Sequence, residues 1–333
     1  FATTLYTGNG STQTITNNLN LSGDGGLVWV KWRSGSATAG NNTNHILVDS
    51  ETGTSGFLES DTTNARTATA AISSFNSNGF TTGGLITDVD NSGDSYASWT
   101  FKKQAKFFDI VTYTGTGVAR NISHSLGSVP GMILVKRTNG AASWRVYHRG
   151  MDATSPQNYF MGINLNTGPQ VSSIQWNDTA PTDTAFTVGT SGNVNGSGNE
   201  FIAYIFAHDT ASDSRIKCGS YVGNNGTLAV DVGWEPQWLL VKNADSGSNE
   251  HWVIVDSVRG MATGSNVPPL YPNLSSGEST TIGITASTTG FTLTGGAGDI
   301  NAGSQNYIYM AIRGNASTDS AITWPTSIKW PAG

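Results

Sequence analysis

The stretch Leu27-Val28-Trp29-Val30-Lys31 is a continuous apolar run that ends in a lysine, and it decides the fold class. It returns as Met132-Ile133-Leu134-Val135-Lys136 and Trp238-Leu239-Leu240-Val241-Lys242, so the Val-Lys pair recurs at steps of 105 and 106 residues. Such runs are typical of strands covered on both faces. Each is followed, after a Gly/Ser/Asn-rich stretch, by a second short apolar run, and the two runs together predict a hairpin.

Further landmarks recur in the same order. Tyr6-Thr7-Gly8 returns as Tyr113-Thr114-Gly115 and Tyr221-Val222-Gly223, and Phe80-Thr81 returns as Phe186-Thr187 and Phe291-Thr292. We therefore predict an all-β chain of three tandem β-sandwich domains of about 106 residues, at 1–107, 108–213 and 214–314. The remaining residues, 315–333, are expected to form an extended C-terminal segment. Because a domain of this size can bury its own core, we expect three beads with interfaces between them, and not solenoid turns that need neighbours.

A last hairpin is predicted late in each third of the chain. In the first, Phe80-Thr81 leads through Val89-Asp90-Asn91-Ser92-Gly93 to Tyr96. Gly with Asn or Asp supplies the positive-φ positions that a tight turn requires. The equivalent turns are Asn195-Gly196-Ser197-Gly198 and Asn301-Ala302-Gly303.

Composition excludes several classes of protein. Only 12% of the 333 residues are charged, and the formal net charge is −6. A chain with 17 Lys and Arg is a poor candidate for nucleic-acid binding, which relies on neutralising many phosphates. No run of 18 apolar residues occurs, so no membrane insertion is expected. Cys218 is alone, which excludes an intrachain disulfide.

The segment Asp88-Val89-Asp90-Asn91-Ser92-Gly93-Asp94 resembles the start of a calcium loop, with Asp88, Asp90 and Asp94 as candidate ligands. The EF-hand pattern also requires an acid six residues after the glycine, where Trp99 stands. The equivalent turns lose the acids and keep the turn residues. Turn geometry is therefore the favoured interpretation, and calcium is the alternative.

Ten Trp and ten Tyr residues raise the possibility of sugar-binding platforms. Trp29, Trp99, Trp144, Trp238 and Trp252 lie within the predicted strands, where a core role is expected. Trp32, Trp176 and Trp234 lie at strand ends or in loops, and we predict that these three rings are exposed and face a ligand.

No motif points to catalysis or to a cofactor. A P-loop, a G-x-G-x-x-G turn, a G-x-S-x-G elbow and paired zinc-ligating histidines are all lacking. We therefore expect no enzyme activity, no cofactor and no metal. Arg149-Gly150-Met151 and Arg259-Gly260-Met261 follow the second strand of their hairpins. A structural corner is favoured there over a binding loop.

Several segments resemble a repeated-domain family encoded by marine tailed bacteriophages, cyanophages included. Its members are commonly described as tail-fibre-like or virion structural proteins. The segments that carry the resemblance include Tyr6-Thr7-Gly8-Asn9-Gly10, His124-Ser125-Leu126-Gly127-Ser128-Val129-Pro130, Trp234-Glu235-Pro236-Gln237-Trp238 and Asp256-Ser257-Val258-Arg259-Gly260. The resemblance implies a place on the virion surface and brings no catalytic residues.

From these observations we expect a virion structural protein, part of a tail fibre or surface appendage that attaches to the host. Its expected partners are other virion proteins, further copies of itself in a homotrimer, and a glycan of the host surface. Three alternatives stay open: a capsid decoration or head-fibre protein, a carbohydrate-binding module, and a depolymerase. The last requires two carboxylates about 5–10 Å apart in a groove.

Overall fold

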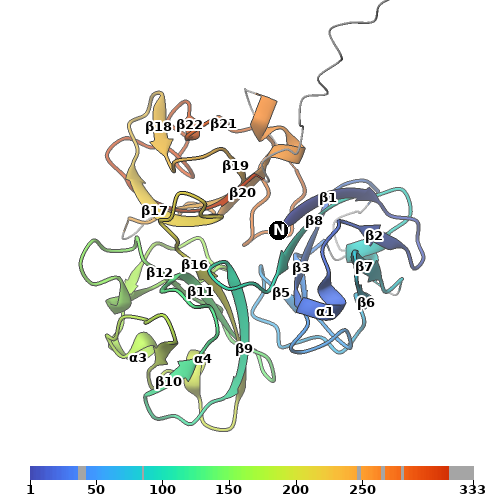
Figure 1. Ribbon diagram of the computed structural model, residues 1–333, viewed down its shortest axis with the longest axis horizontal. Coiled ribbons are helices and arrows are strands. Elements are labelled where there is room, and N and C mark those ends of the chain that lie inside the picture. The colour runs from blue at the N-terminus through green and yellow to red at the C-terminus, as the bar shows by residue number, and fades with distance from the viewer. Residues whose placement is uncertain (37–42, 85, 246–248, 264–266, 279–280, 315–333) are drawn as a thin grey trace, which may run out of the picture.

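Three large antiparallel sheets, one from each third of the chain, surround a common centre (Figure 1). The computed structural model describes residues 1–36, 43–84, 86–245, 249–263, 267–278 and 281–314. The prediction of an all-β fold is confirmed, since the helices among the described residues are single turns of three or four residues. The predicted extended segment at 315–333 lies outside the described residues.

The three large sheets repeat one strand order. The first runs β1 (Ala2–Thr7), β8 (Ser95–Lys102), β3 (Gly26–Ser34), β4 (Ile46–Asp49) and β5 (Leu58–Glu59). The second runs β9 (Phe108–Thr114), β16 (Glu200–Ala207), β11 (Pro130–Arg137) and β12 (Arg145–His148). The third runs β17 (Ile216–Val222), β23 (Asn306–Arg313), β19 (Pro236–Asn243) and β20 (Val253–Asp256).

Smaller sheets cover the outer faces, which gives each large sheet a sandwich-like partner. They are β2 (Thr14–Thr16), β7 (Gly79–Thr82) and β6 (Ile72–Asn76); β10 (Arg120–Ser123) and β15 (Ala185–Val188); β13 (Tyr159–Phe160) and β14 (Gln170–Val171); and β18 (Leu228–Asp231), β22 (Gly290–Leu293) and β21 (Ile284–Ser287). The short helices are α1 (Leu21–Asp24), α2 (Thr87–Asp90), η1 (Pro156–Asn158), α3 (Ser173–Trp176), α4 (Gly192–Asn195), η2 (Ser257–Arg259) and η3 (Met261–Thr263).

The hairpins predicted from the apolar runs are confirmed. β3 pairs antiparallel with β4, β11 with β12, and β19 with β20. The hairpin predicted late in each third is wrong. In the first third, β7 pairs with β2 and β6, whereas β8 pairs with β1 and β3. The Asp- and Asn-rich segment between them therefore crosses from the small sheet to the large one, through α2.

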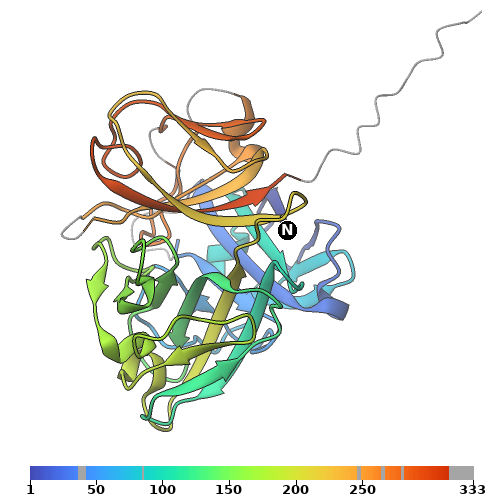
Figure 2. The ribbon, with the colours of Figure 1, turned by 60° about the vertical axis from the view of Figure 1, so that its left-hand side comes forward.

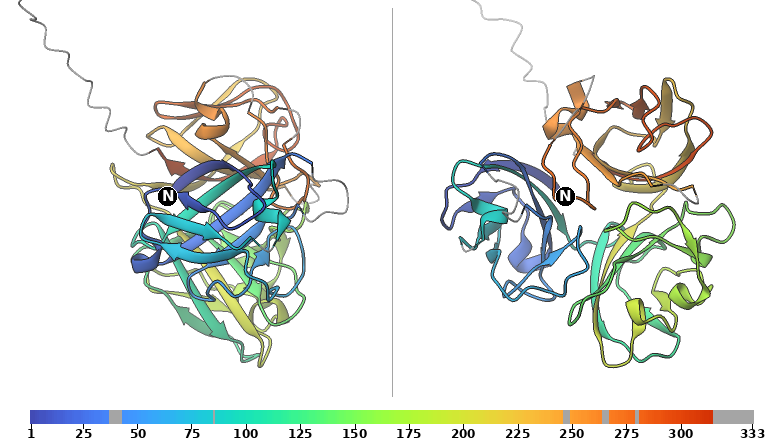
Figure 3. Two further views of the ribbon diagram at one scale, coloured as in Figure 1. Left: turned by 90° about the vertical axis from the view of Figure 1, so that its right-hand side faces the viewer. Right: turned by 180° about the vertical axis from the view of Figure 1, so that it is seen from behind.

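The three large sheets share a core where they meet. One buried cluster, called here the central core, draws on all three large sheets and includes Leu27, Phe101, Met132, Phe206 and Trp238. A second cluster belongs to the third large sheet and a third cluster to the first. The views from other directions show the same three lobes in contact (Figures 2 and 3). The domain boundaries at residues 107 and 213 stay a prediction.

Alternation along each strand explains why the deciding runs are apolar throughout. In β3, Leu27 and Trp29 face the central core, whereas Val28 and Val30 face the core of the first sheet. In β19, Trp238 and Leu240 face the central core, whereas Leu239 and Val241 face the core of the third sheet. Successive side chains of a strand point to opposite faces, so both faces of these strands are buried.

The recurring Tyr-x-Gly segment holds the small sheet to the large one. The tyrosine hydroxyl donates to a backbone carbonyl of the crossing segment, and the residue after the glycine donates its backbone N–H to an Asp or Asn side chain there. The first contact is Tyr6 to Val89 at 2.7 Å, Tyr113 to Val194 at 2.7 Å and Tyr221 to Ile300 at 2.6 Å. The second is Asn9 to Asp90 at 2.8 Å, Thr116 to Asn195 at 2.9 Å and Asn224 to Asn301 at 3.0 Å.

Candidate functional site

Two sets of buried hydrogen bonds close the three large sheets into a ring. The first set starts from the residue directly before β4, β12 or β20. His45 Nε2 bonds Tyr271 O at 3.0 Å, Trp144 Nε1 donates to Glu59 O at 2.9 Å, and Trp252 Nε1 donates to Gly162 O at 2.9 Å. The bond of His45 joins the first large sheet to the last third of the chain. The bond of Trp144 joins the second large sheet to the first, and that of Trp252 joins the third large sheet to the second third of the chain.

The second set uses the last residue of the same strands. Tyr204 Oη donates to Asp49 Oδ2 at 3.0 Å, Trp99 Nε1 donates to Asp256 Oδ2 at 3.0 Å, and His148 Nε2 bonds Tyr309 O at 3.0 Å. Buried polar groups are costly unless they find partners. Each of these six bonds forms only when a neighbouring sheet is in place, so the contacts specify the ring.

Two of the three lysines that end the deciding runs contact the same junctions. Lys31, Lys136 and Lys242 are fully buried, and burial lowers the pKa of each to about 8. Lys31 Nζ donates to the carbonyl oxygen of Ser275, in the last third of the chain, at 2.8 Å. Lys136 Nζ donates to the carbonyl oxygen of Thr63, in the first third of the chain, at 3.0 Å. Lys31 and Lys136 therefore donate to backbone at the sheet junctions, whereas Lys242 Nζ donates to Asn243 O of its own strand at 2.9 Å.

Acidification should reduce the stability that the neutral His148 ring contributes to the fold. Its Nδ1 accepts from Gly150 N at 3.0 Å, so the ring is neutral with its proton on Nε2, and burial lowers its pKa to about 3. In the unfolded chain the pKa is near 6.5. The stability it contributes is complete above pH 6.5 and is lost as pH falls from there, because the unfolded chain then binds more protons.

The test compares the wild type with His148→Asn in urea at several pH values. Burial also raises the pKa of Asp88 to about 7 and of Asp61 to about 6, and these groups stabilise the fold on acidification, so the wild-type profile alone is not decisive. We expect the stability advantage of the wild type over the variant to shrink by about 1.4 kcal/mol per pH unit below pH 6.5. An advantage that stays constant down to pH 5 would refute the neutral buried histidine.

The candidate calcium ligands are occupied by protein donors. Asp90 accepts from Asn9 N at 2.8 Å, from Gln13 Nε2 at 2.7 Å and from Thr82 Oγ1 at 2.5 Å. Asp94 accepts from Ser36 N at 2.6 Å and from Asn91 Nδ2 at 2.9 Å, and Asp88 accepts from Asn44 N at 3.2 Å. Within the described ranges, no group of three or more His, Cys, Asp or Glu side chains is arranged to hold a metal ion. Hydrogen bonds that hold the crossing segment in place therefore occupy these three carboxylates.

The prediction of three exposed aromatic rings is wrong for two of them. Trp176 and Trp234 are 2% and 4% exposed. Their indole N–H groups donate to Tyr159 O at 2.9 Å and to Ser214 Oγ at 3.1 Å. Trp176 ends the short helix α3 and Trp234 lies two residues before β19, and the strand pattern alone does not reveal that either ring is buried. Trp32 is half-buried, and its Nε1 donates to Asp94 Oδ2 at 3.1 Å.

Arg259 occupies a structural corner, as the sequence favoured. It is buried, its Nε lies 2.6 Å from Asp256 Oδ2, and its Nη1 lies 3.2 Å from Glu278 Oε1. Its guanidinium carbon lies 5.6 Å from the centre of the Trp99 ring. This network joins the third sheet to the first.

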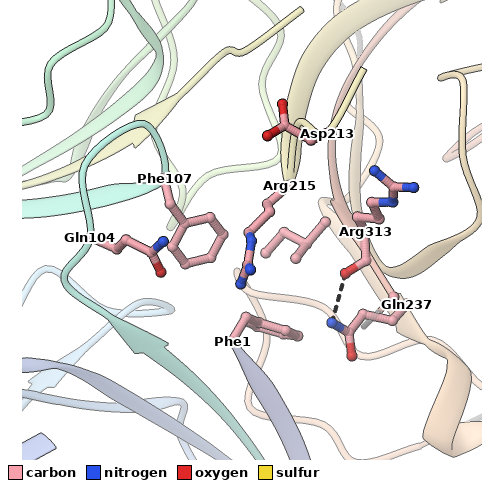
Figure 4. A pocket seen from close by; sticks show the side chains of 9 residues that line it. Phe1, Gln104, Phe107, Asp213, Arg215, Gln237 and Arg313 are labelled. Atoms are coloured by element: carbon pink, nitrogen blue, oxygen red, sulfur yellow. Dashed lines mark hydrogen bonds between the residues drawn. The ribbon is translucent and has the colours of Figure 1, made fainter. Parts of the chain in front are cut away.

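A cavity of about 360 Å³ opens where the two segments that link the sheets meet the ends of β1 and β23 (Figure 4). It was not predicted, because its walls come from five separate parts of the chain. Apolar side chains and polar side chains share the lining, which consists of Phe1, Gln104, Phe107, Asp213, Arg215, Gln237, Ile312, Arg313 and Gly314. Such mixed walls are usual in sites for small ligands.

Two further surface depressions bear on the sequence predictions. One, of about 620 Å³, is lined in part by Trp234, so this ring borders open space although it is buried. Another, of about 490 Å³, is lined by Asp24 and Glu51. These two carboxylates form ion pairs with Lys102 and Lys103, at 3.1 and 2.7 Å. Neither is therefore poised as a free acid.

The fold and the ring of contacts define an all-β protein built from sandwich-like sheets around a shared core. By its sequence, the chain belongs to the family described as Domain of unknown function (DUF7483), whose model matches residues 1–315. Comparison with curated proteins finds no match. None of the helices in the described part of the chain is long and apolar enough to span a membrane.

Proposed function

We propose that this protein is a structural protein of a tailed-bacteriophage virion, part of a tail fibre or surface appendage that attaches to the host. The proposal rests first on the sequence resemblance to virion proteins of marine phages. One structural observation also favours it: the buried polar bonds that close the ring serve to fix a rigid frame. A rigid frame with variable loops suits display at a surface.

The proposal includes self-association, with a homotrimer as the expected state. An edge strand supports it, since β17 ends the third sheet and pairs with no further strand of the described residues on its outer side. Unpaired edges are commonly covered by a further chain. Other virion proteins and a host glycan are the remaining proposed partners, and repetition of the sheets would raise avidity for a glycan.

Immunogold electron microscopy of purified virions tests the proposal, with an antibody raised to residues 108–213. We expect gold label at the tail or at fibre tips. Label spread over the capsid would favour the second candidate, a capsid decoration or head-fibre protein, which the resemblance supports equally. Particles that carry no label, beside a positive control antibody to a known virion protein, would reject the virion assignment.

A further inference from the structure

We propose that the cavity beside Arg215 binds an acidic sugar, with the carboxylate of a uronic acid on the guanidinium and the sugar ring against the apolar wall. This inference rests on the proposed function, because it names the class of host glycan that such an appendage would contact. The cavity's volume of about 360 Å³ is at the small end of ligand pockets, which run from roughly 300 to 1,000 Å³. It therefore suits one or two sugar rings.

The guanidinium of Arg215 is the group that selects an anion. Its side chain is exposed and makes no hydrogen bond or ion pair with any residue of the described ranges. Figure 4 shows the guanidinium extending between Phe1 and Phe107, while the carboxylate of Asp213 points away from it. A free arginine matches a carboxylate in charge and in its paired hydrogen-bond geometry.

A second arginine and two amides supply further polar contacts. Arg313 Nη1 donates to Ser212 O at 3.2 Å, which holds this cation at the wall. Gln237 Nε2 donates to Arg313 O at 2.8 Å, which leaves its side-chain oxygen able to accept from a hydroxyl. The Gln104 amide makes no side-chain hydrogen bond with the described residues. Two arginines against one aspartate leave the lining with a net positive charge.

The apolar wall provides a surface for the sugar ring. Phe1, Phe107 and Ile312 line the cavity. Phe107 and Ile312 are only 3% and 1% exposed, so the partly buried ring of Phe1 offers most of the accessible apolar surface. The ring of Phe1 lies 4.9 Å from that of Phe101 and 6.0 Å from that of Trp238, so it is fixed in place. A fixed apolar surface beside hydrogen-bonding groups is the combination that orients a ligand.

Isothermal titration of the full chain with digalacturonic acid tests the inference, with neutral galactobiose as the matched ligand. We expect the acid disaccharide to bind and the neutral one to bind at least tenfold more weakly. Arg215→Ala should weaken acid binding at least tenfold, whereas Arg137→Ala, which removes a half-buried arginine of the second sheet, should leave it unchanged. Because Arg215 is exposed, equal melting temperatures will show that its variant folds.

Each other outcome overturns the inference. Equal binding of both disaccharides would remove the role of the carboxylate, and acid binding that survives Arg215→Ala would place the ligand elsewhere. No binding of either would reject the sugar site. None of these results affects where the antibody labels the particle, so failure of the sugar site and failure of the virion assignment are told apart.

Discussion

Replacing Trp238 by alanine should lower the free energy of unfolding by about 3–5 kcal/mol, the usual cost of removing a large buried aromatic ring. Trp238 lies on β19 and is fully buried in the central core. Its ring is 5.8 Å from Phe101 and 6.0 Å from Phe1, both from the first third of the chain. Urea unfolding of the variant and the wild type measures the loss.

The matched control is Trp238→Phe. The indole N–H of Trp238 has no hydrogen-bond partner in the described structure, so a phenyl ring loses packing and no polar contact. We expect a clearly smaller loss than for alanine. A loss below 1 kcal/mol for the alanine variant would mean that the three sheets are not packed on one core.

Replacing Asp256 by alanine should cost about 3–5 kcal/mol, because it removes the closer of the two acidic partners of the buried Arg259. Asp256 is fully buried and accepts from Trp99 Nε1 at 3.0 Å and from Arg259 Nε at 2.6 Å. The change therefore breaks an ion pair within the third sheet and a bond to the first. Chemical unfolding followed by tryptophan fluorescence reports the loss.

Asp183→Ala provides the comparison, since Asp183 is exposed and surface substitutions usually change stability by less than about 0.5 kcal/mol. The double variant Asp256→Ala, Arg259→Met should recover part of the loss, because it removes both charges together. If Asp256→Ala alone were as mild as Asp183→Ala, the buried network would not hold the sheets together.

The strands could be predicted because their pattern is local. The runs that end in Lys31, Lys136 and Lys242 carry enough apolar residues to indicate strands buried on both faces, and their spacing revealed the recurrence. The sequence did not indicate what covers the second face. Leu27 and Trp238 lie far apart in the chain, and their shared core depends on how whole sheets pack.

The turn and site residues were harder to predict for a different reason. Asp90 and Asn195 suit a tight turn and a crossing segment equally well, since both need the same backbone freedom and the same side-chain acceptors. The burial of Trp176 depends on the path of its loop. The cavity beside Arg215 joins Phe1 to Arg313, and no local pattern connects residues at such a separation.

Differential scanning calorimetry of the chain tests the central claim most directly, which is that the three sheets fold as one cooperative body around a shared core. The account predicts a single transition in which the calorimetric and van't Hoff enthalpies agree, with a ratio of about one. Three resolved transitions, or a ratio near three, would show three independent units and contradict it.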